Sequence, residues 1–435
     1  MKTTTADTPS LTAPPQQRIH GLDVARALAI AGMAYNHLAP PDMPGEALVA
    51  GYPSALFAVL AGFSVALMTA QGNRLGGTAL AQSRHRLLVR GILVLIIGAV
   101  LQFFPGPILI VLSSIAAILI VLGPTTRWST RNLCWLLAAF MVSGPIIQWV
   151  SSITGGYLPI VSGAYPLFAW LCYGIVGILV HRYLPQRLMH LIAVAGVGIA
   201  VGATSIWLRT KYLLSPAIPY VGKGSDSAAS ETLEPVEGGF WGHFFALGAH
   251  TGGIGDVIVS AAMAVGVIAA CVALCRVSLI KRVLYPIRAL GSMSLSAYVL
   301  HVITAALFLA LMAGTVGSLF SLISPPPSDE SKAESISSIM PWPEYQELVE
   351  QAQNWEEHWE QQSQYYDDYE TAKYEESGQP GTLSAWLWTM ALLLSFASVW
   401  KYFFRRGPAE WFIHVAEKKL TTQDLPPQAD KAQLV

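Results

Sequence analysis

Charged side chains are scarce in this sequence. They make up 12% of the 435 residues, about half the share of roughly 25% that is typical of soluble domains. Apolar residues make up 53%, and the mean hydropathy is positive at +0.47. This small share of charged residues cannot cover the surface of a water-soluble chain of this length. The composition therefore excludes a soluble globular enzyme and indicates an integral membrane protein.

The apolar segments lack the strict polar and apolar alternation of a transmembrane β-barrel. They form continuous runs long enough to cross the roughly 30 Å of hydrocarbon in a bilayer. Since backbone polar groups cannot stay unpaired in lipid, these runs must be helices. We therefore predict an all-α fold, a polytopic membrane bundle of about ten transmembrane helices, near 22–39, 52–71, 88–104, 106–123, 132–150, 164–181, 189–208, 255–275, 289–313 and 384–403.

Cysteine is also rare, with four residues that all lie within or at the edge of apolar runs: Cys134, Cys172, Cys271 and Cys275. Such cysteines are typical small buried hydrophobes, so we predict neither a disulfide framework nor a metal site. The sequence contains no Walker loop, no Gly-rich dinucleotide loop, no His-Glu-x-x-His and no Gly-x-Ser-x-Gly. These absences exclude the common soluble catalytic schemes.

Lysines and arginines are unevenly distributed between the loops. In the short loops they follow the second, fourth, sixth, eighth and tenth predicted spans, which places those of the short loops on one side. By the positive-inside rule this side, with both termini, is the cytoplasm. We expect a multi-pass protein of the inner or plasma membrane.

The predicted segments follow from these spans. They are a flexible cytoplasmic tail (1–17), a bundle of nine spans (18–319) with an outer loop (209–254), an acidic extracytoplasmic loop (320–383), the last transmembrane helix (384–403) and a cytoplasmic tail (404–435). The aromatic run within the outer loop is a candidate short interfacial helix. The acidic loop fits either a solvated, partly disordered segment or a docking surface for a cationic partner.

Ionisable residues inside a bilayer are expensive, so each is a functional candidate. In the first predicted helix Arg26, Met33 and His37 share one face, and Asp23 lies close to it. His37 lies roughly 16 Å along the axis from Arg26, at 1.5 Å per residue. Beside Asn36 at the outer end, His37 can act as a general base. The alternative is an ordinary interfacial histidine at a helix end.

The ninth predicted span has a second polar stripe. Ser294, Tyr298 and His301 recur at i, i+4 and i+7, which places a hydroxyl, a phenol and an imidazole on one helix face. We expect this face to look into the bundle. Its alternative role is hydrogen bonding between helices, which is common in membranes.

Two further groups are candidate binding sites on opposite sides. On the outer side, His250 and Asp256 bracket a glycine-rich run, 251–255, where backbone amides can approach a ligand closely. We assign them, with Tyr52 at the outer start of the second span, to substrate binding.

On the cytoplasmic side Arg84, His85, Arg86 and Arg90 form a dense basic patch. This patch suits a phosphate-bearing ligand. The alternative is the ordinary positive-inside bias.

Residues 18–33, followed by Asn36 and His37, resemble the opening helix of membrane acyltransferases. The families are the heparan-α-glucosaminide N-acetyltransferase-like proteins, the related bacterial inner-membrane proteins and, more distantly, the acyltransferase-3 family. Further similar segments are 56–64, 162–177, 290–298 and 407–411.

This resemblance implies transfer of an acyl group, in the first place acetyl, from cytoplasmic acetyl-CoA to a hydroxyl or amine of an extracytoplasmic cell-envelope glycan or glycolipid. Asn36 matches the asparagine at the outer end of that first helix, and His37 matches the histidine found there in the acyltransferase-3 family. However, the N-acetyltransferase branch places its catalytic histidine in the following outer loop, and residues 38–51 contain none. Either His37 takes that role or the reaction differs.

We therefore predict catalytic roles for His37, Asn36, Tyr298 and His301. We predict that acyl-CoA is bound by basic residues: Arg26, Arg84, Arg86 and Arg90. We expect acetyl-CoA to be the donor substrate, and we expect no metal to be required. The expected partners are the lipid bilayer and the glycan or glycolipid acceptor, and no nucleic acid is expected to bind. The resemblance also suggests a homodimer. The alternatives are a transporter or flippase of a small polar or lipid-linked substrate, and a non-enzymatic protein that binds partners through 343–376.

Overall fold

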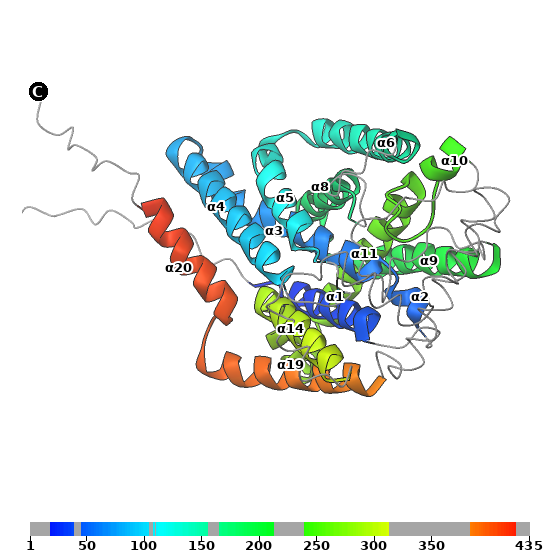
Figure 1. The fold of residues 1–435 in the computed structure, drawn as a ribbon. Helices are drawn as coiled ribbons and strands as arrows, with labels where there is room; N and C mark the ends of the chain where they lie inside the picture. Colours follow the sequence, from blue (N-terminus) through cyan, green and yellow to red (C-terminus); the bar gives the residue numbers. More distant parts are fainter. Residues whose placement is uncertain are drawn as a thin grey trace, which may run out of the picture.

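All secondary structure in the described part of the chain is helical, which confirms the predicted all-α fold (Figure 1). The computed structural model describes residues 18–38, 45–103, 108, 110–154, 165–212, 239–312 and 383–422. The predicted tail 1–17, the acidic loop up to residue 382, the middle of the outer loop and the last part of the C-terminal tail lie outside these residues.

The helices follow one another in this order: α1 (His20–Leu38), α2 (Glu46–Val49), α3 (Tyr52–Leu75), α4 (Gly77–Leu101), α5 (Leu112–Leu122), the 3-10 helix η1 (Pro124–Arg127), α6 (Thr130–Thr154), α8 (Leu167–Tyr183), α9 (Leu188–Tyr212), α10 (Gly239–Phe244), α11 (Ile254–Leu274), α12 (Ser278–Val283), α13 (Tyr285–Gly291), α14 (Ser294–Met312), α19 (Leu383–Phe403) and α20 (Pro408–Thr422). The short helix expected in the aromatic run is present as α10.

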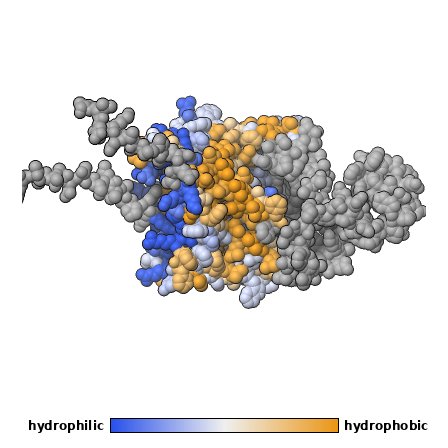
Figure 2. All heavy atoms as spheres, turned by 60° about the vertical axis from the view of Figure 1, so that its left-hand side comes forward, coloured by the Kyte–Doolittle hydropathy of each residue, from blue (hydrophilic) through white to orange (hydrophobic). Residues whose placement is uncertain are grey.

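The bundle has the composition of a multi-pass membrane protein. Within the described residues, five helical segments are long and apolar enough to cross a membrane, and six if the bent pair α13 and α14 is one span. The other predicted spans fall on α1, α4 and the shorter apolar helices α5 and α8, so the number of ten crossings stays a prediction. Figure 2 shows a hydrophobic belt next to a hydrophilic band at one end of the molecule.

Small residues bring the central helices into close contact. A Cβ atom at Gly62 of α3 would overlap the backbone of Gly174 in α8, and one at Gly177 would overlap the backbone of α3. Gly198 of α9 and Gly266 of α11 approach each other in the same way. Such contacts are typical of membrane bundles, where dispersion forces and not water exclusion hold helices together.

The ninth predicted span is not one continuous helix, so the prediction over 289–313 is wrong in this respect. The chain bends by 89° between α13 and α14. Gly291, before the bend, packs directly on the backbone carbonyl of Asp23 in α1. After it, Glu410 accepts hydrogen bonds from the amides of Leu295 (2.8 Å) and Ser296 (3.3 Å). An external carboxylate thus satisfies amides that the first turn of α14 leaves unpaired.

Part of the predicted C-terminal tail is the helix α20, which packs against α4 and α14 at one end of the bundle (Figure 1). Trp411 and Phe412 are 60% and 54% exposed, and Lys418 and Lys419 are also exposed. Exposed aromatic residues combined with lysines are typical of a helix that lies in a membrane interface.

Candidate functional site

Two of the predicted catalytic residues, His37 and His301, form a stacked pair between α1 and α14. Their ring centroids are 6.2 Å apart and their planes differ by 19°. His37 is partly exposed, whereas His301 is completely buried. Neither ring nitrogen of His301 has a hydrogen-bond partner among the described residues. A buried imidazole without a partner is costly in a protein core, which marks this pair as a candidate site.

Tyr298 completes this cluster. Its ring lies edge-on to His301 at 4.8 Å and stacks on Phe57 at 6.2 Å. Its hydroxyl oxygen accepts a hydrogen bond from the backbone amide of Val111 at 3.2 Å. This bond fixes the phenol and leaves its hydrogen available as a donor. Asn36 is partly exposed at the same end of α1. We call His37, His301 and Tyr298 the histidine cluster.

A second polar group lies at the predicted outer ends of α3, α9 and α11. Asp256 is 2% exposed and accepts hydrogen bonds from Gly252 N (3.2 Å) and Ser260 Oγ (3.0 Å). The guanidinium of Arg209 lies 3.9 Å from the Asp256 carboxylate and 5.3 Å from the centre of the Tyr52 ring. The cation of Arg209 therefore contacts both a buried anion and an aromatic face.

The predicted substrate-binding residue His250 belongs to the same region. Its backbone has a φ of 61°, and its ring lies edge-on to Tyr165 at 5.3 Å. Burial and, to a smaller extent, the positive charge of Arg209 together lower the pKa of His250 to about 4. His250 is therefore neutral at pH 7 and can accept or donate a hydrogen bond.

The structure thus brings the three predicted substrate-binding residues to one region and adds Arg209, which sequence reasoning missed. An arginine on the predicted outer side runs against the positive-inside bias, and this was the signal that could have found it. Nε and Nη2 of Arg209 are buried without a hydrogen-bond partner in the described part of the chain.

The basic end of the molecule holds a cavity of about 310 Å³. Its lining comes from the start of α1, from α4, from the bend before α14 and from α20: Arg18, Arg90, Ser292, Arg405, Arg406, Glu410, His414 and Glu417. We call this the arginine cavity. Its formal charge is positive because four arginines face two glutamates.

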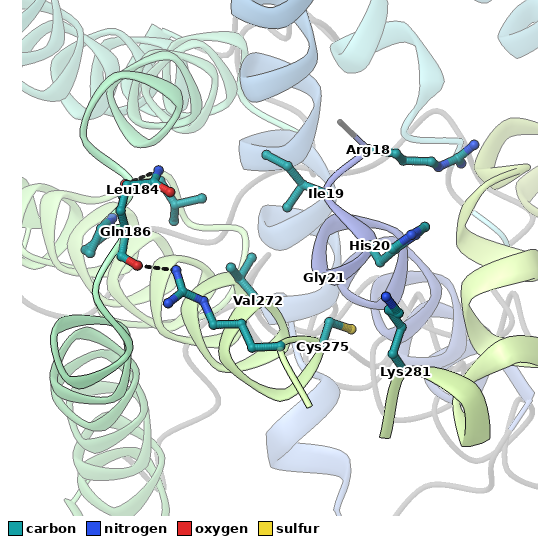
Figure 3. Close-up of a pocket in the computed structure, with 11 residues that line it drawn as sticks. Arg18, Ile19, His20, Gly21, Leu184, Gln186, Val272, Cys275 and Lys281 are labelled. Atoms are coloured by element: carbon teal, nitrogen blue, oxygen red, sulfur yellow. Dashed lines mark hydrogen bonds between the residues drawn. The ribbon is translucent and has the colours of Figure 1, made fainter. Parts of the chain in front are cut away.

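A second cavity of about 240 Å³ also has Arg18 in its lining. Figure 3 shows Arg18 and Lys281 on one side of it and the turn from Leu184 to Gln186 on the other. The guanidinium of Arg276 donates a hydrogen bond to the Gln186 carbonyl. Arg276 is thereby held in the cavity wall and fixes this turn against the C-terminal end of α11.

The four arginines predicted to bind acyl-CoA do not form one group. Arg26 contacts Asp23 at 3.3 Å and donates to Ser64 Oγ at 3.0 Å. Arg84 donates to the Pro124 carbonyl at 2.9 Å.

Arg86 is exposed on α4, and only Arg90 lines the arginine cavity. The other arginines of this cavity come from near the two ends of the chain, so no local pattern on α4 could indicate that they lie close to Arg90.

No group of three histidine, cysteine, aspartate or glutamate residues is placed to hold a metal ion in the described ranges. A family model described as "Protein of unknown function (DUF418)" matches residues 239–324. The match includes His250, Asp256, Tyr298 and His301. No curated protein and no solved structure matches the chain, so the resemblance to acyltransferases stays a prediction.

Proposed function

We propose that this protein is a membrane acyltransferase that moves an acyl group, in the first place acetyl, from cytoplasmic acyl-CoA to a hydroxyl or amine of an extracytoplasmic envelope glycan or glycolipid. The observation that carries the proposal is the stacked pair of His37 and His301. In this pair a partly exposed imidazole stacks on a buried one inside a membrane bundle, and the ring nitrogens of the buried imidazole have no hydrogen-bond partner among the described residues. Imidazole is the side chain best suited to proton transfer at neutral pH.

The proposed reaction needs only the histidine cluster and its neighbour Asn36. His37 takes the proton from the acceptor as its oxygen or nitrogen bonds to the thioester carbonyl carbon. Tyr298 and Asn36 donate hydrogen bonds to the oxyanion that forms. The carbon–sulfur bond then breaks, and the CoA thiolate takes the proton from His37. His301 supports the protonated His37 from its buried side.

The course of α1 supports access from both sides of the membrane. The helix begins at the basic end, where Arg18 and Arg26 share Asp23, and its other end carries His37. Arg26 and His37 are separated by roughly 16 Å along the axis. In this proposal the phosphates of the donor stay at the basic end, and its extended arm follows α1 to His37.

The rival function is a transporter or flippase, which the 89° bend between α13 and α14 favours. Broken spans form substrate sites in many transporters, where the free N-terminus of a half-helix binds an anion. Here Glu410 already occupies the first amides of α14. The bend therefore lacks the free N-terminus that such a transport site uses.

The first test measures acetyl-CoA binding and the release of free CoA by the purified protein in detergent. We expect binding and slow hydrolysis by the wild type, and a fall of about 100-fold or more in hydrolysis for His37→Ala. His190→Ala, which removes an exposed histidine from α9, is the matched control and should keep full activity.

Full hydrolysis by His37→Ala, or no acetyl-CoA binding by the wild type, would overturn the proposal. The transporter alternative is tested in proteoliposomes that contain no acyl-CoA. Movement of a labelled lipid-linked sugar under these conditions, unaffected by His37→Ala, would favour the rival.

A further inference from the structure

We infer that the arginine cavity is a binding site for a phosphate-bearing ligand and that the C-terminal helix α20 completes it. Four arginines converge there from three separate parts of the chain. Arg18 precedes α1, Arg90 lies on α4, and Arg405 and Arg406 lie in the turn between α19 and α20. Like charges gathered around one cavity repel each other, so this arrangement favours an anion at its centre.

Among the residues that the structure describes, three of the four arginines have no anionic partner. Arg90 contacts the sulfur of Met68 at 3.2 Å, which does not neutralise its charge. In the described ranges, neither it nor Arg405 nor Arg406 forms an ion pair. The fourth, Arg18, forms a two-pronged contact with Asp23 at 2.8 and 3.1 Å.

The two glutamates of the cavity do not cancel this charge. Glu410 has its oxygens committed to Leu295 N, Ser296 N and Ser296 Oγ, at the positive end of the α14 helix dipole. The α14 amides therefore compensate its charge. Only Glu417 remains to face the arginines, and the cavity keeps a positive field.

The chemistry of the lining matches a phosphate group. A guanidinium presents paired N–H donors at the spacing of two phosphate oxygens, and several guanidiniums can surround one phosphate. The volume of about 310 Å³ is at the lower end of the range for small-ligand sites, about 300 to 1,000 Å³. The cavity thus accommodates a phosphate and part of the group attached to it.

The phosphate has two possible sources. One is a soluble nucleotide such as CoA, an identification that rests on the proposed function. The other is the headgroup of an anionic phospholipid, because α20 exposes Trp411 and Phe412 next to lysines, as interfacial helices do. The anion site itself depends on neither source.

The test uses the full-length protein, with the double variant Arg405→Gln/Arg406→Gln in the cavity. Arg131→Gln, an exposed arginine at the start of α6, is the matched control. Binding of CoA and of adenosine 3′,5′-bisphosphate is measured by calorimetry in detergent. In the second arm, the melting temperature is compared in nanodiscs of phosphatidylglycerol and of phosphatidylcholine.

We expect either the soluble probes or phosphatidylglycerol to bind the wild type and Arg131→Gln, and at least a tenfold weaker effect in the double variant. Binding that also weakens at high salt supports charge recognition. If the double variant does not fold, Arg405→Lys/Arg406→Lys keeps the charge but loses the paired donors, and it should bind more weakly than the wild type. The inference is overturned if no probe binds the wild type, or if the tested cavity variant binds as well as Arg131→Gln.

These outcomes separate the site from the enzyme. Phosphate binding by a wild type that never turns over acetyl-CoA would support the cavity site and overturn the acyltransferase proposal. Acetyl-CoA turnover with an unchanged KM in the double variant, together with unchanged phospholipid binding, would overturn the cavity site and leave the acyltransferase proposal intact.

Discussion

The carboxylate of Glu410 accepts a hydrogen bond from the backbone amide of Leu295 at 2.8 Å, although 115 positions separate the two residues in the sequence. This contact joins α20 to the first turn of α14. It therefore stabilises the bend before α14 and places one wall of the arginine cavity. The Glu410 side chain, together with the hydrogen bond from Ala409 N to Ser296 Oγ at 3.0 Å, links the C-terminal helix to the element that carries Tyr298 and His301.

Removal of this cap should destabilise the protein. We expect Glu410→Ala to lower the free energy of unfolding by about 1 to 2 kcal/mol, the typical range for loss of a helix cap. Lys419→Ala, which removes an exposed lysine from the same helix, is the control, and its thermal midpoint should stay close to that of the wild type. Thermal unfolding followed by tryptophan fluorescence measures both. Equal midpoints for the two variants would contradict the capping role.

Two of the glycines in α9, Gly196 and Gly198, provide a matched pair for testing the packing of helices. A Cβ at Gly198 would overlap α11 near Ala262 and Gly266, whereas a Cβ at Gly196 meets no atom within 4 Å. We expect Gly198→Ala to cost about 1 to 3 kcal/mol through overpacking. Gly196→Ala should be neutral, or stabilising by up to about 1 kcal/mol, because alanine favours a helix. The free energies of unfolding of the two variants are compared in detergent. A Gly196→Ala variant less stable than Gly198→Ala would refute the close contact at Gly198.

Anion binding in the arginine cavity should strengthen as the pH falls. Burial lowers the pKa of His414, and the charges of Arg406, Arg90 and Lys418 lower it further, while Glu417 opposes them. The ring is therefore neutral at pH 7 and gains a proton below its ordinary pKa of 6.5. Each proton gained adds a positive charge beside the bound anion, so the affinity rises with acidity.

The measurement follows the stabilisation by phosphatidylglycerol between pH 7.5 and 5, because a phosphodiester does not titrate in this range. The variant His414→Gln should lose the increase and keep the affinity found at pH 7.5. A pH dependence that persists in His414→Gln would assign it to another group.

The contact between Arg209 and Asp256 should appear as energetic coupling. Arg209→Gln leaves a buried carboxylate without its cation, and such a loss is destabilising. Adding Asp256→Asn removes that charge, so the double variant should be more stable than the sum of the single effects predicts. We expect a coupling free energy of about 1 to 3 kcal/mol. The free energies of unfolding of the wild type, the two single variants and the double variant complete a double-mutant cycle. Strictly additive effects would show that the two residues do not interact.

Local patterns were sufficient for the parts of the fold that a bilayer dictates. The apolar runs predicted helices because lipid leaves the backbone no other way to pair its polar groups. The spacing of Tyr298 and His301 predicted one helix face, and both side chains are indeed buried on α14. These features depend only on the helical repeat and on the solvent around the chain.

Contacts between distant segments could not be predicted in this way. No periodicity indicates that Gly291 packs on Asp23, or that a glutamate of α20 caps α14, so the 89° bend was missed. The basic patch on α4 was assigned as a unit, but the structure directs Arg84 to the Pro124 carbonyl and only Arg90 into the cavity. The partners of a long side chain depend on which helices lie next to it.

The sequence by itself determined that this chain is a helical membrane protein, and it indicated most of the polar residues that the bilayer makes costly. Only the tertiary structure decided which of them meet: His37 with His301, Arg209 with Asp256, and Arg18 with Arg90, Arg405 and Arg406. The physical reason is range. Helix formation and membrane insertion depend on neighbours within a few turns. A site, in contrast, forms where glycine contacts and a helix cap from a distant segment of the same chain bring separate helices together.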